Sequence, residues 1–547
     1  MTKISPLKYA AFLSILILIF GGVGLAKGGL YIGRHEGDTA HMIEIVLRML
    51  QGQVPHLDFS TPIGMFAFLP AVGFAKVGLG LGQAFIAGQV LVAVLLAPMV
   101  VRVAVSRLSG LAAWGFGFVT VSMILSLVHG ENITALSVSM YYNRWAWAAA
   151  FIAILLAALP PREDARAPGM DGVLDGMIVG AMLAALALLK PTYFVAFVAP
   201  IAIAFVLRGA WRSLWIGVLT GAVIAALMVA VYGVDFFPAY VSDLLSVTRS
   251  DTRAAPGAPL MEVINGPRFM IATLTLILSV IVLRQAGQDR AGLVLFLLAP
   301  GFVYVTYQNF GNDPKWLMLL AIYLLALRPE AGRRVVFNAD ARNAVAGLAL
   351  VAFALITPSF QNIVTSPFRH LATKALDYAP QFKTRSELRD VFVKTQRTAT
   401  VLGRVVLVDD LPQLAPYVVE DDLFKPVTFL GETLPRCTLQ SGDVAMHSYM
   451  ADRLKQPPFN FPKDSQFFVA DIASGIWILG GFEPLKGGAP WYYSGTPGIE
   501  NADAIIVPTC PLDTEIERNA LAALEAAGLV LRAPLRDDTM LVYRIVK

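Results

Sequence analysis

Charged residues and cysteines are both scarce in this sequence. Charged side chains make up 15% of its 547 residues, whereas soluble proteins carry about 25%, so an ordinary soluble protein is excluded. The sequence contains no Walker loop, GxGxxG motif, CxxC pair or zinc-ligand spacing, and we find no internal repeat. Nothing in it therefore indicates a nucleotide site, a redox pair of thiols or a structural zinc.

Long apolar runs are what the sequence has instead. A run of about 20 apolar residues can cross a bilayer as a helix, and such runs recur from Leu7 to Thr357. The pattern predicts a polytopic α-helical membrane protein with about 11–13 transmembrane helices. Twelve candidate runs lie near residues 7–26, 62–79, 84–105, 111–128, 144–160, 173–189, 191–207, 212–232, 268–284, 291–307, 315–328 and 343–357.

The orientation of these runs follows from the basic residues beside them. Lys3 and Lys8 favour a cytoplasmic N-terminus, and the first run is long for a signal peptide, so we expect an uncleaved anchor. Strict alternation of all the runs then puts Arg102 and Arg107 outside, against the positive-inside rule. A run between 62 and 128 is therefore either re-entrant or divided differently. The sequence leaves open whether the number of crossings in this region is odd or even.

The character of the chain changes after Pro358. Residues 366–547 have an ordinary density of charge, and short β-rich runs alternate with Pro, Gly and Asp turns. A helix-like run ends on Gly528, so the segment predicts a small α/β domain beside a helical module at 1–360. Both cysteines, Cys437 and Cys510, fall within it. They could form a disulfide if the domain is extracytoplasmic; the alternative is two unrelated buried thiols.

The loop after the first run (27–61) contains several acids and an amphipathic segment. From Asp38 onward the apolar residues recur every three or four positions, which predicts a helix lying in the membrane interface with its apolar stripe toward lipid. Glu44 and Arg48 would form an i,i+4 pair on it, and Gly52 would end it. Asp38 falls near the N-cap. Together with a turn at Asp58, these structural roles are one complete explanation of the acids.

The alternative explanation is chemical. A carboxylate beside the membrane surface is well placed to deprotonate a hydroxyl or amine that attacks a lipid-borne electrophile. The segments "EGD" (36–38), "IVLRMLQG" (45–52), "VPHLDF" (54–59) and "TPIG" (61–64) resemble the first external loop of the membrane-embedded GT-C glycosyltransferases. The resemblance is strongest to their aminoarabinose-transferase and RgtA–D-like groups, and covers roughly residues 30–110.

The resemblance implies an activity and a role for the acids. Members of these groups more often carry adjacent Asp and Glu, whereas here Gly37 separates Glu36 from Asp38. Alignment on Met49-Leu50 puts Asp38 at the position of the catalytic acid. The implied enzyme moves a sugar from a polyprenyl-phosphate donor to a cell-envelope lipid, polysaccharide or protein on the extracytoplasmic face, with inversion. Asp38 would be the base, and Glu36 would assist it or bind a metal.

Cations within or beside membrane spans are costly, so they are candidates for holding the donor phosphate. Lys190 lies between two long apolar runs and favours this role. Arg144 and Lys315 could equally extend toward lipid headgroups, and Arg268 favours that alternative. Aromatic and amide residues nearby suit a sugar, although aromatic belts are common at membrane interfaces. The candidate substrate-binding residues are Lys190, Arg144, Tyr141, Tyr142, Asp58, Lys315 and Asn312.

Several properties stay open at this stage. The acids and histidines of the first loop could bind a divalent cation, but their spacing is not diagnostic, so the metal is unknown. Residues 233–267 could close over the donor and exclude water, or form a disordered connector. We expect a bacterial inner-membrane protein with residues 366–547 in the periplasm. Its partners would be the lipid-linked sugar, an envelope glycan or lipid acceptor and membrane lipids, with no nucleic acid.

Two other functions compete with the transferase. A transporter or flippase of a lipid-linked or small solute needs the same helices and cations, but it predicts repeat-related halves, and no such symmetry is visible. A non-catalytic envelope scaffold would be insensitive to replacement of Asp38.

Overall fold

The chain folds into two compact units. The computed structural model describes residues 4–130, 132–165, 170–248, 260–309, 313–398, 411–417, 426–439 and 442–546. One unit, here called the helical unit, comprises Met1–Leu30, Ile63–Phe237 and Ala255–Thr373. The other, the α/β unit, comprises Tyr31–Pro62, Pro238–Ala254 and Lys374–Lys547. The first loop therefore clusters with the C-terminal residues.

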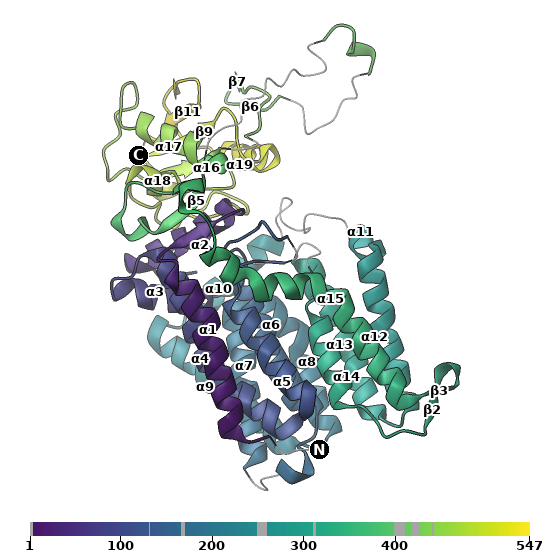
Figure 1. Ribbon diagram of the computed structural model, residues 1–547. Helices are drawn as coiled ribbons and strands as arrows, with labels where there is room; N and C mark the ends of the chain where they lie inside the picture. Colours follow the sequence, from purple (N-terminus) through teal and green to yellow (C-terminus); the bar gives the residue numbers. More distant parts are fainter. Residues whose placement is uncertain are drawn as a thin grey trace. The chain divides into compact units, whose positions relative to one another are not determined.

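The helical unit is built from long apolar helices, which are drawn in Figure 1. Seven helices in the described part of the chain are long and apolar enough to cross a membrane, and this confirms the prediction of a multi-pass helical protein. They are α1 (Pro6–Ala26), α4 (Leu81–Arg107), α7 (Asp171–Leu189), α9 (Trp211–Tyr232), α12 (Pro267–Gln285), α13 (Asp289–Gln308) and α15 (Ala341–Leu371).

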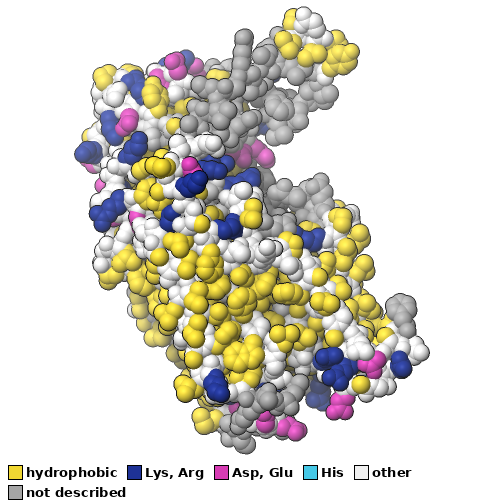
Figure 2. All heavy atoms as spheres, viewed as in Figure 1, with side chains coloured by type: hydrophobic (Ala, Val, Ile, Leu, Met, Phe, Trp, Pro, Cys, Tyr) yellow, Lys and Arg dark blue, Asp and Glu magenta, His cyan; other side chains and the backbone are white. Residues whose placement is uncertain are grey.

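The remaining apolar helices are shorter or have a more polar end. Shorter ones are α5 (Gly110–Leu125), α8 (Pro191–Leu207) and α14 (Trp316–Ala326); α6 (Tyr141–Ala158) begins with the polar residues of its first turn. Figure 2 shows hydrophobic side chains covering the visible face of the helical unit. Many of them, such as Leu18, Leu95 and Leu219, are more than half exposed. An apolar surface of this kind suits a lipid environment.

The predicted span at 62–79 is wrong. This run forms a 3₁₀ turn at Met65–Ala67 and then the eight-residue helix α3 (Leu69–Lys76). Eight residues extend only about 12 Å as a helix, which is too short to cross a bilayer. Gly64, just before this run becomes helical, packs against α7 so closely that an added Cβ would lie 2.1 Å from the carbonyl oxygen of Leu188.

The α/β unit has a four-stranded sheet in the order β10-β11-β9-β8. Strands β8 (Phe467–Val469) and β9 (Ala504–Pro508) are parallel, while β11 (Met540–Arg544) is antiparallel to both β9 and β10 (Leu535–Arg536). Helix α19 (Thr514–Ala526) covers the sheet and contributes Leu521 and Leu524 to its apolar core. These elements confirm the small sheet-containing region predicted for the C-terminal part.

Smaller elements of the same unit surround the sheet. A three-stranded sheet has the order β1-β5-β4, and Cys437 and Cys510 form a disulfide, which settles the open alternative for them. The elements are β1 (Leu30–Ile32), α2 (Glu36–Leu50), β4 (Tyr378–Pro380), β5 (Val391–Lys394), α16 (Thr395–Thr398), β6 (Thr428–Phe429), β7 (Glu432–Thr433), α17 (Asp443–Arg453) and α18 (Ile476–Gly480).

The segment at 233–267 is partly helical. It contains α10 (Phe236–Thr248) and α11 (Leu260–Asn265), while residues 249–259 lie outside the described part. Asp243 of α10 fixes the end of the first loop within the α/β unit. Its carboxylate accepts hydrogen bonds from the Ser60 hydroxyl at 2.8 Å and the Thr61 N–H at 3.0 Å, and it lies 2.8 Å from His56 Nδ1.

Candidate functional site

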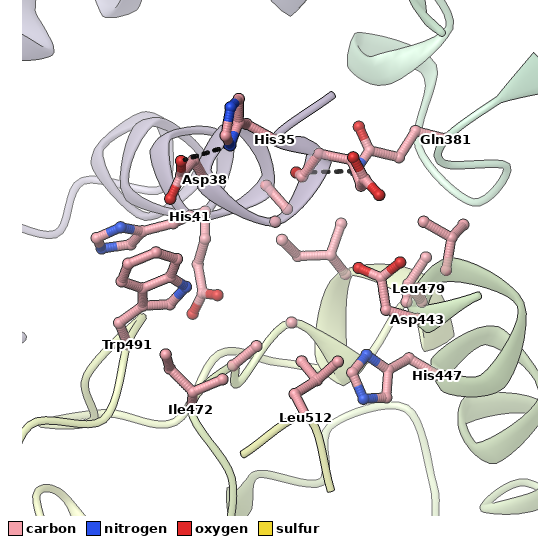
Figure 3. A pocket seen from close by; sticks show the side chains of 18 of the residues that line it. His35, Asp38, His41, Gln381, Asp443, His447, Ile472, Leu479, Trp491 and Leu512 are labelled. Atoms are coloured by element: carbon pink, nitrogen blue, oxygen red, sulfur yellow. Dashed lines mark hydrogen bonds and ion pairs between the residues drawn. The ribbon is translucent and has the colours of Figure 1, made fainter. Parts of the chain in front are cut away.

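The first-loop helix begins two residues earlier than predicted. Helix α2 starts at Glu36, and its N-cap is His35, which has a left-handed φ of 65° and makes no side-chain capping bond. Asp38 therefore lies in the first turn, near the N-cap as predicted, but it is the third residue of the helix and not the cap itself. Its carboxylate lies 3.8 Å from His35 Nδ1, and Figure 3 shows the two side chains turned toward each other. Gly52, with a φ of 91°, follows the helix end as predicted.

Glu36 is held by an arginine from the C-terminal part of the α/β unit. Arg397 Nε lies 2.7 Å and 2.8 Å from the two carboxylate oxygens of Glu36, and its Nη2 lies 2.6 Å from Oε1. The Gln381 amide donates a hydrogen bond to the Glu36 carbonyl at 3.3 Å. The bidentate pair neutralises Glu36 and fixes the first turn of α2.

Asp443 and His447 lie across the cavity from α2 in Figure 3. Asp443 is the first residue of α17, and its carboxyl points into the open space. Burial, and secondarily the charge of Glu36, raises the pKa of Asp443 to about 6. His447 lies one turn later, where burial lowers its pKa to about 4. Burial also lowers the pKa of His35, so these two imidazoles are neutral at physiological pH.

An aromatic pair forms another part of the same wall. The ring of His41 stacks on the indole of Trp491 with centroids 4.4 Å apart and planes 10° from parallel. The cavity measures about 420 Å³. Its charged and polar lining consists of Arg34, His35, Glu36, Asp38, His41, Glu44, Gln381, Arg397, Asp443 and His447, and its apolar lining includes Phe382, Leu439, Ile472, Ile478, Leu479, Pro490, Trp491 and Leu512.

The predicted pair of Glu44 and Arg48 is confirmed, and it is structural. Arg48 Nη2 donates to Glu44 Oε1 at 3.1 Å. The same oxygen accepts bonds from the Ser474 hydroxyl at 2.7 Å and the Trp477 indole N–H at 3.0 Å. The predicted exposure of the apolar stripe of this helix to lipid is wrong, because Met42, Ile45, Val46 and Met49 are all buried. Glu44 and Arg48 are buried as well, and residues of the segment 474–485 supply partners for both charges.

Asp58 marks a turn, as predicted. Its Oδ2 accepts a hydrogen bond from the Val54 N–H at 2.7 Å, and it is not among the residues that line the cavity. No group of three or more His, Cys, Asp or Glu side chains that could hold a metal occurs within the described ranges.

The helical unit contains a separate polar cluster, where the predicted cations lie. Arg144 is completely buried at the start of α6, and its Nη2 and Nη1 donate to the carbonyl oxygens of Ser126 and Ser139 at 2.9 Å and 3.3 Å. Lys190, at the α7–α8 junction, has its Nζ 5.6 Å from the ring centroid of Tyr142. In the described part of the chain, neither cation has a carboxylate within ion-pair distance.

The other predicted residues of this cluster are differently placed. Asp313 lies 2.7 Å from Arg268 and 3.9 Å from Lys315, so these two cations share one carboxylate. The Tyr141 hydroxyl donates to the Ala67 carbonyl at 2.6 Å, a structural bond. Asn312 lies outside the described residues.

Amides and a phenol complete the cluster. The Asn143 side chain donates to Asn309 at 3.1 Å, and Asn309 donates to the Tyr193 hydroxyl at 3.2 Å. A narrow cavity of about 10 Å³ lies among these groups, Arg144 and Lys315. The polar groups thus come from helices that are far apart in the sequence.

No family model, curated protein or solved structure matches this chain.

Sequence reasoning did not find several residues of the α/β cavity. Arg397, Asp443, His447 and Trp491 lie more than 300 residues after α2, and no motif marks them. A weak signal existed for Asp443, because an acid after glycine at the start of a helical run is typical of a helix N-terminus. That signal predicts a helix end and no chemistry.

Proposed function

We propose that the protein is a membrane glycosyltransferase that uses a polyprenyl-phosphate sugar as donor and a cell-envelope molecule as acceptor. The observation that carries this proposal is that Arg144 and Lys190, two cations of the helical unit, have no carboxylate within ion-pair distance among the residues that the structure describes. A charge in such surroundings is costly unless it is paired. An anionic group that arrives with a membrane lipid would supply the missing partner, and a lipid phosphate has this chemistry.

The proposed reaction is a single displacement. Asp38 takes the proton of an acceptor hydroxyl, and the acceptor oxygen then attacks the anomeric carbon of the donor sugar. The bond from that carbon to the phosphate oxygen breaks, so the configuration inverts and the lipid phosphate leaves with one more negative charge. Lys190 and Arg144 stabilise this developing charge. Glu36, held by Arg397, assists by fixing the first turn of α2.

The proposed orientation puts the α/β unit on the extracytoplasmic side of a bacterial inner membrane. With α3 left out, we assign the other eleven apolar helices as crossing: α1, α4 to α9 and α12 to α15. The shortest of them, α14, has 11 residues and extends about 17 Å, so its crossing includes the residues that flank it. Alternation from a cytoplasmic N-terminus then places Arg102, Arg107 and Arg162 inside, as the positive-inside rule favours. It also places all three segments of the α/β unit outside, where a disulfide is usual.

Hydrogen bonds within the helical unit support this alternation. The Arg162 N–H donates to the Ser106 carbonyl at 2.9 Å, and Arg208 donates to the Leu156 carbonyl at 2.7 Å. These residues all belong to the end assigned to the cytoplasm. The Asn143–Asn309 bond joins two helix ends assigned to the opposite side.

The test is transfer of radiolabelled sugar from a panel of polyprenyl-phosphate donors to envelope extracts by the purified protein. Wild type should transfer, and Asp38→Asn should lose about 10²–10⁴-fold in rate, because asparagine keeps the size but cannot accept the proton. Asp377→Asn, an exposed position in the same unit, is the matched control and should retain activity.

Two results would count against the proposal. Equal transfer by wild type and Asp38→Asn would remove Asp38 as the base. Absence of transfer with every donor, combined with Lys190-dependent movement of a lipid-linked sugar across proteoliposomes, would favour the transporter.

A further inference from the structure

The cavity of the α/β unit has two chemically different walls. One wall carries the side chains of Glu36, Arg397 and Asp443, and the other carries the stacked rings of His41 and Trp491 together with aliphatic residues. Its volume of about 420 Å³ lies within the range of small-molecule sites. Figure 3 shows Asp443, His41 and Trp491 around the same open space.

Among the four acids that line this cavity, Asp443 is the one for which no ion pair occurs in the described ranges. Glu36 is neutralised by the bidentate contact with Arg397, and Glu44 is neutralised by Arg48. Asp38 is turned toward His35. Asp443 has no ion-pair partner in the described ranges, and its carboxyl points into the space. The charged and titratable groups that face it are Glu36, Arg397 and His447.

The aromatic wall is rigid. A parallel stack 4.4 Å apart holds the Trp491 indole in place, and Ile472 and Leu512 extend the apolar surface beside it. A planar indole next to hydrogen-bonding carboxyl groups matches a pyranose ring, which has an apolar C–H face and a rim of hydroxyls. Stacking contributes free energy, and the carboxyl group accepts hydrogen bonds from the hydroxyls.

The same walls disfavour other ligands. An anionic ligand would meet the carboxyls of Asp443 and Asp38. Of the two guanidinium groups in the lining, that of Arg397 is already paired with Glu36, and that of Arg34 is the other. A divalent cation would need a cluster of ligands, and none of the required kind occurs in the described residues. A neutral, hydroxyl-rich molecule fits both walls.

We propose that this cavity binds a neutral sugar unit of the acceptor, with Asp443 accepting a hydroxyl hydrogen bond and Trp491 stacking on the ring. The inference rests on the proposed transferase function and narrows its acceptor to a glycan or glycolipid. Asp443 is a binding residue in this assignment, and Asp38 keeps the role of base.

The test measures sugar binding to the full-length protein in nanodiscs, with no lipid donor present. Saturation-transfer NMR would be recorded with cellobiose, maltose and chitobiose as neutral probes, and with glucuronic acid and glucosamine as anionic and cationic probes. At least one neutral disaccharide should bind. Asp443→Ala should weaken binding about 10-fold through loss of a charge-assisted hydrogen bond, and Trp491→Ala about 5-fold through loss of stacking.

The controls separate binding from folding. Asp452→Asn changes a solvent-exposed aspartate on the same helix, which pairs with Lys455, and should bind as wild type does. Asp443→Asn keeps the size of the side chain and one acceptor oxygen, so it should be intermediate between wild type and Asp443→Ala. Wild-type binding should strengthen as the pH rises from about 5 to 7, where Asp443 ionises, and this dependence should vanish in Asp443→Asn.

The result that overturns the inference is equally concrete. Binding of no neutral disaccharide, or binding that is equal in wild type, Asp443→Ala and Trp491→Ala, would exclude a sugar site here, as would preference for glucuronic acid. Because no donor is present, loss of transferase activity cannot imitate these outcomes. Sugar binding without any transfer would leave the site intact and refute the proposed reaction alone.

Discussion

The charged side chains at the two ends of the helical unit have different kinds of partner. At one end Arg102 contacts Asp171 at 2.6 Å and Asp175 at 2.9 Å, and Arg107 also pairs with Asp175. At the other end, within the described residues, Arg144 donates to carbonyl oxygens and Lys190 lies over an aromatic ring, with no carboxylate at ion-pair distance from either. The two arginines and two aspartates of the first group balance one another, whereas Arg208 at the same end donates to the Leu156 and Ala157 carbonyls much as Arg144 does to its own partners.

This difference separates structural charges from functional ones. A buried ion pair neutralises itself and requires nothing else, whereas an unpaired buried cation keeps its desolvation cost until an anion binds. The second arrangement contributes no stability by itself. The proposed function gives it a role, because an anionic ligand bound beside Asn143, Asn309 and Tyr193 would pair with these cations.

The largest expected contrast between the two ends is their accessibility. In spheroplasts, a membrane-impermeant maleimide should label Thr134→Cys, beside the unpaired cations, and should not label Glu163→Cys, near the paired ones. Both positions are exposed, and the native cysteines are joined in a disulfide and do not react. Lysis should make both positions reactive. Labelling of Glu163→Cys before lysis would contradict the proposed orientation, because it would put this end of the helical unit outside the cell.

The next contrast is in the cost of removing a cation. Lys190→Met should lower the transfer rate by about 100-fold or more, because the departing phosphate loses a stabilising charge, while folding is unchanged. Arg107→Met should do the opposite: it leaves Asp175 with a single partner and costs about 3 kcal/mol of stability. Activity assays and thermal unfolding of both variants test whether Lys190→Met loses activity and Arg107→Met loses stability.

The interpretation fails if the two variants behave alike. A Lys190→Met protein that unfolds as readily as Arg107→Met would show that Lys190 is structural. Arg144→Met provides a second measurement at the same end, and it should resemble Lys190→Met.

The sequence predicted the helices because their signal is local. A run such as 211–232 is apolar throughout, and the backbone must satisfy its own hydrogen bonds in lipid, so composition alone specifies the element. The run at 62–79 is similarly apolar, but it forms only a 3₁₀ turn and the short helix α3, with Gly64 packed closely against Leu188. That contact joins residues more than 120 positions apart, and no local pattern contains it.

The α/β cavity was harder to predict for the same reason. Glu36 and Asp38 were found through a local motif, and Gly52 and the Glu44–Arg48 pair through helix periodicity. Arg397 and Asp443 become neighbours of Glu36 only when the unit folds. The helix was predicted to start near Asp38 because the apolar pattern starts there. It begins two residues earlier, at Glu36.

A buried acid of the α/β unit offers a further comparison with the buried cations. Unlike an arginine, a carboxylate without a partner can become neutral by binding a proton. Glu517 of α19 is 3% exposed, and its Oε1 has no hydrogen-bond partner within the described ranges. Burial, and secondarily the nearby Asp471, raises its pKa to about 8. The native state therefore binds this proton more tightly than the unfolded chain does, whose glutamate has a pKa near 4.5.

The sign of the pH dependence follows from that difference. The stability that Glu517 contributes is fully present below pH 4.5 and is lost as the pH rises through about 8. Glu517→Gln removes the ionisation, so it should stabilise the unit at pH 8 by about 2–4 kcal/mol and have little effect at pH 4. Hydrogen exchange in β9 and α19, corrected for the intrinsic rate at each pH, would measure it. Glu515→Gln, exposed on the same helix, should show no such gain, and a loss of protection in Glu517→Gln at pH 8 would mean that the ionised carboxylate has a stabilising partner.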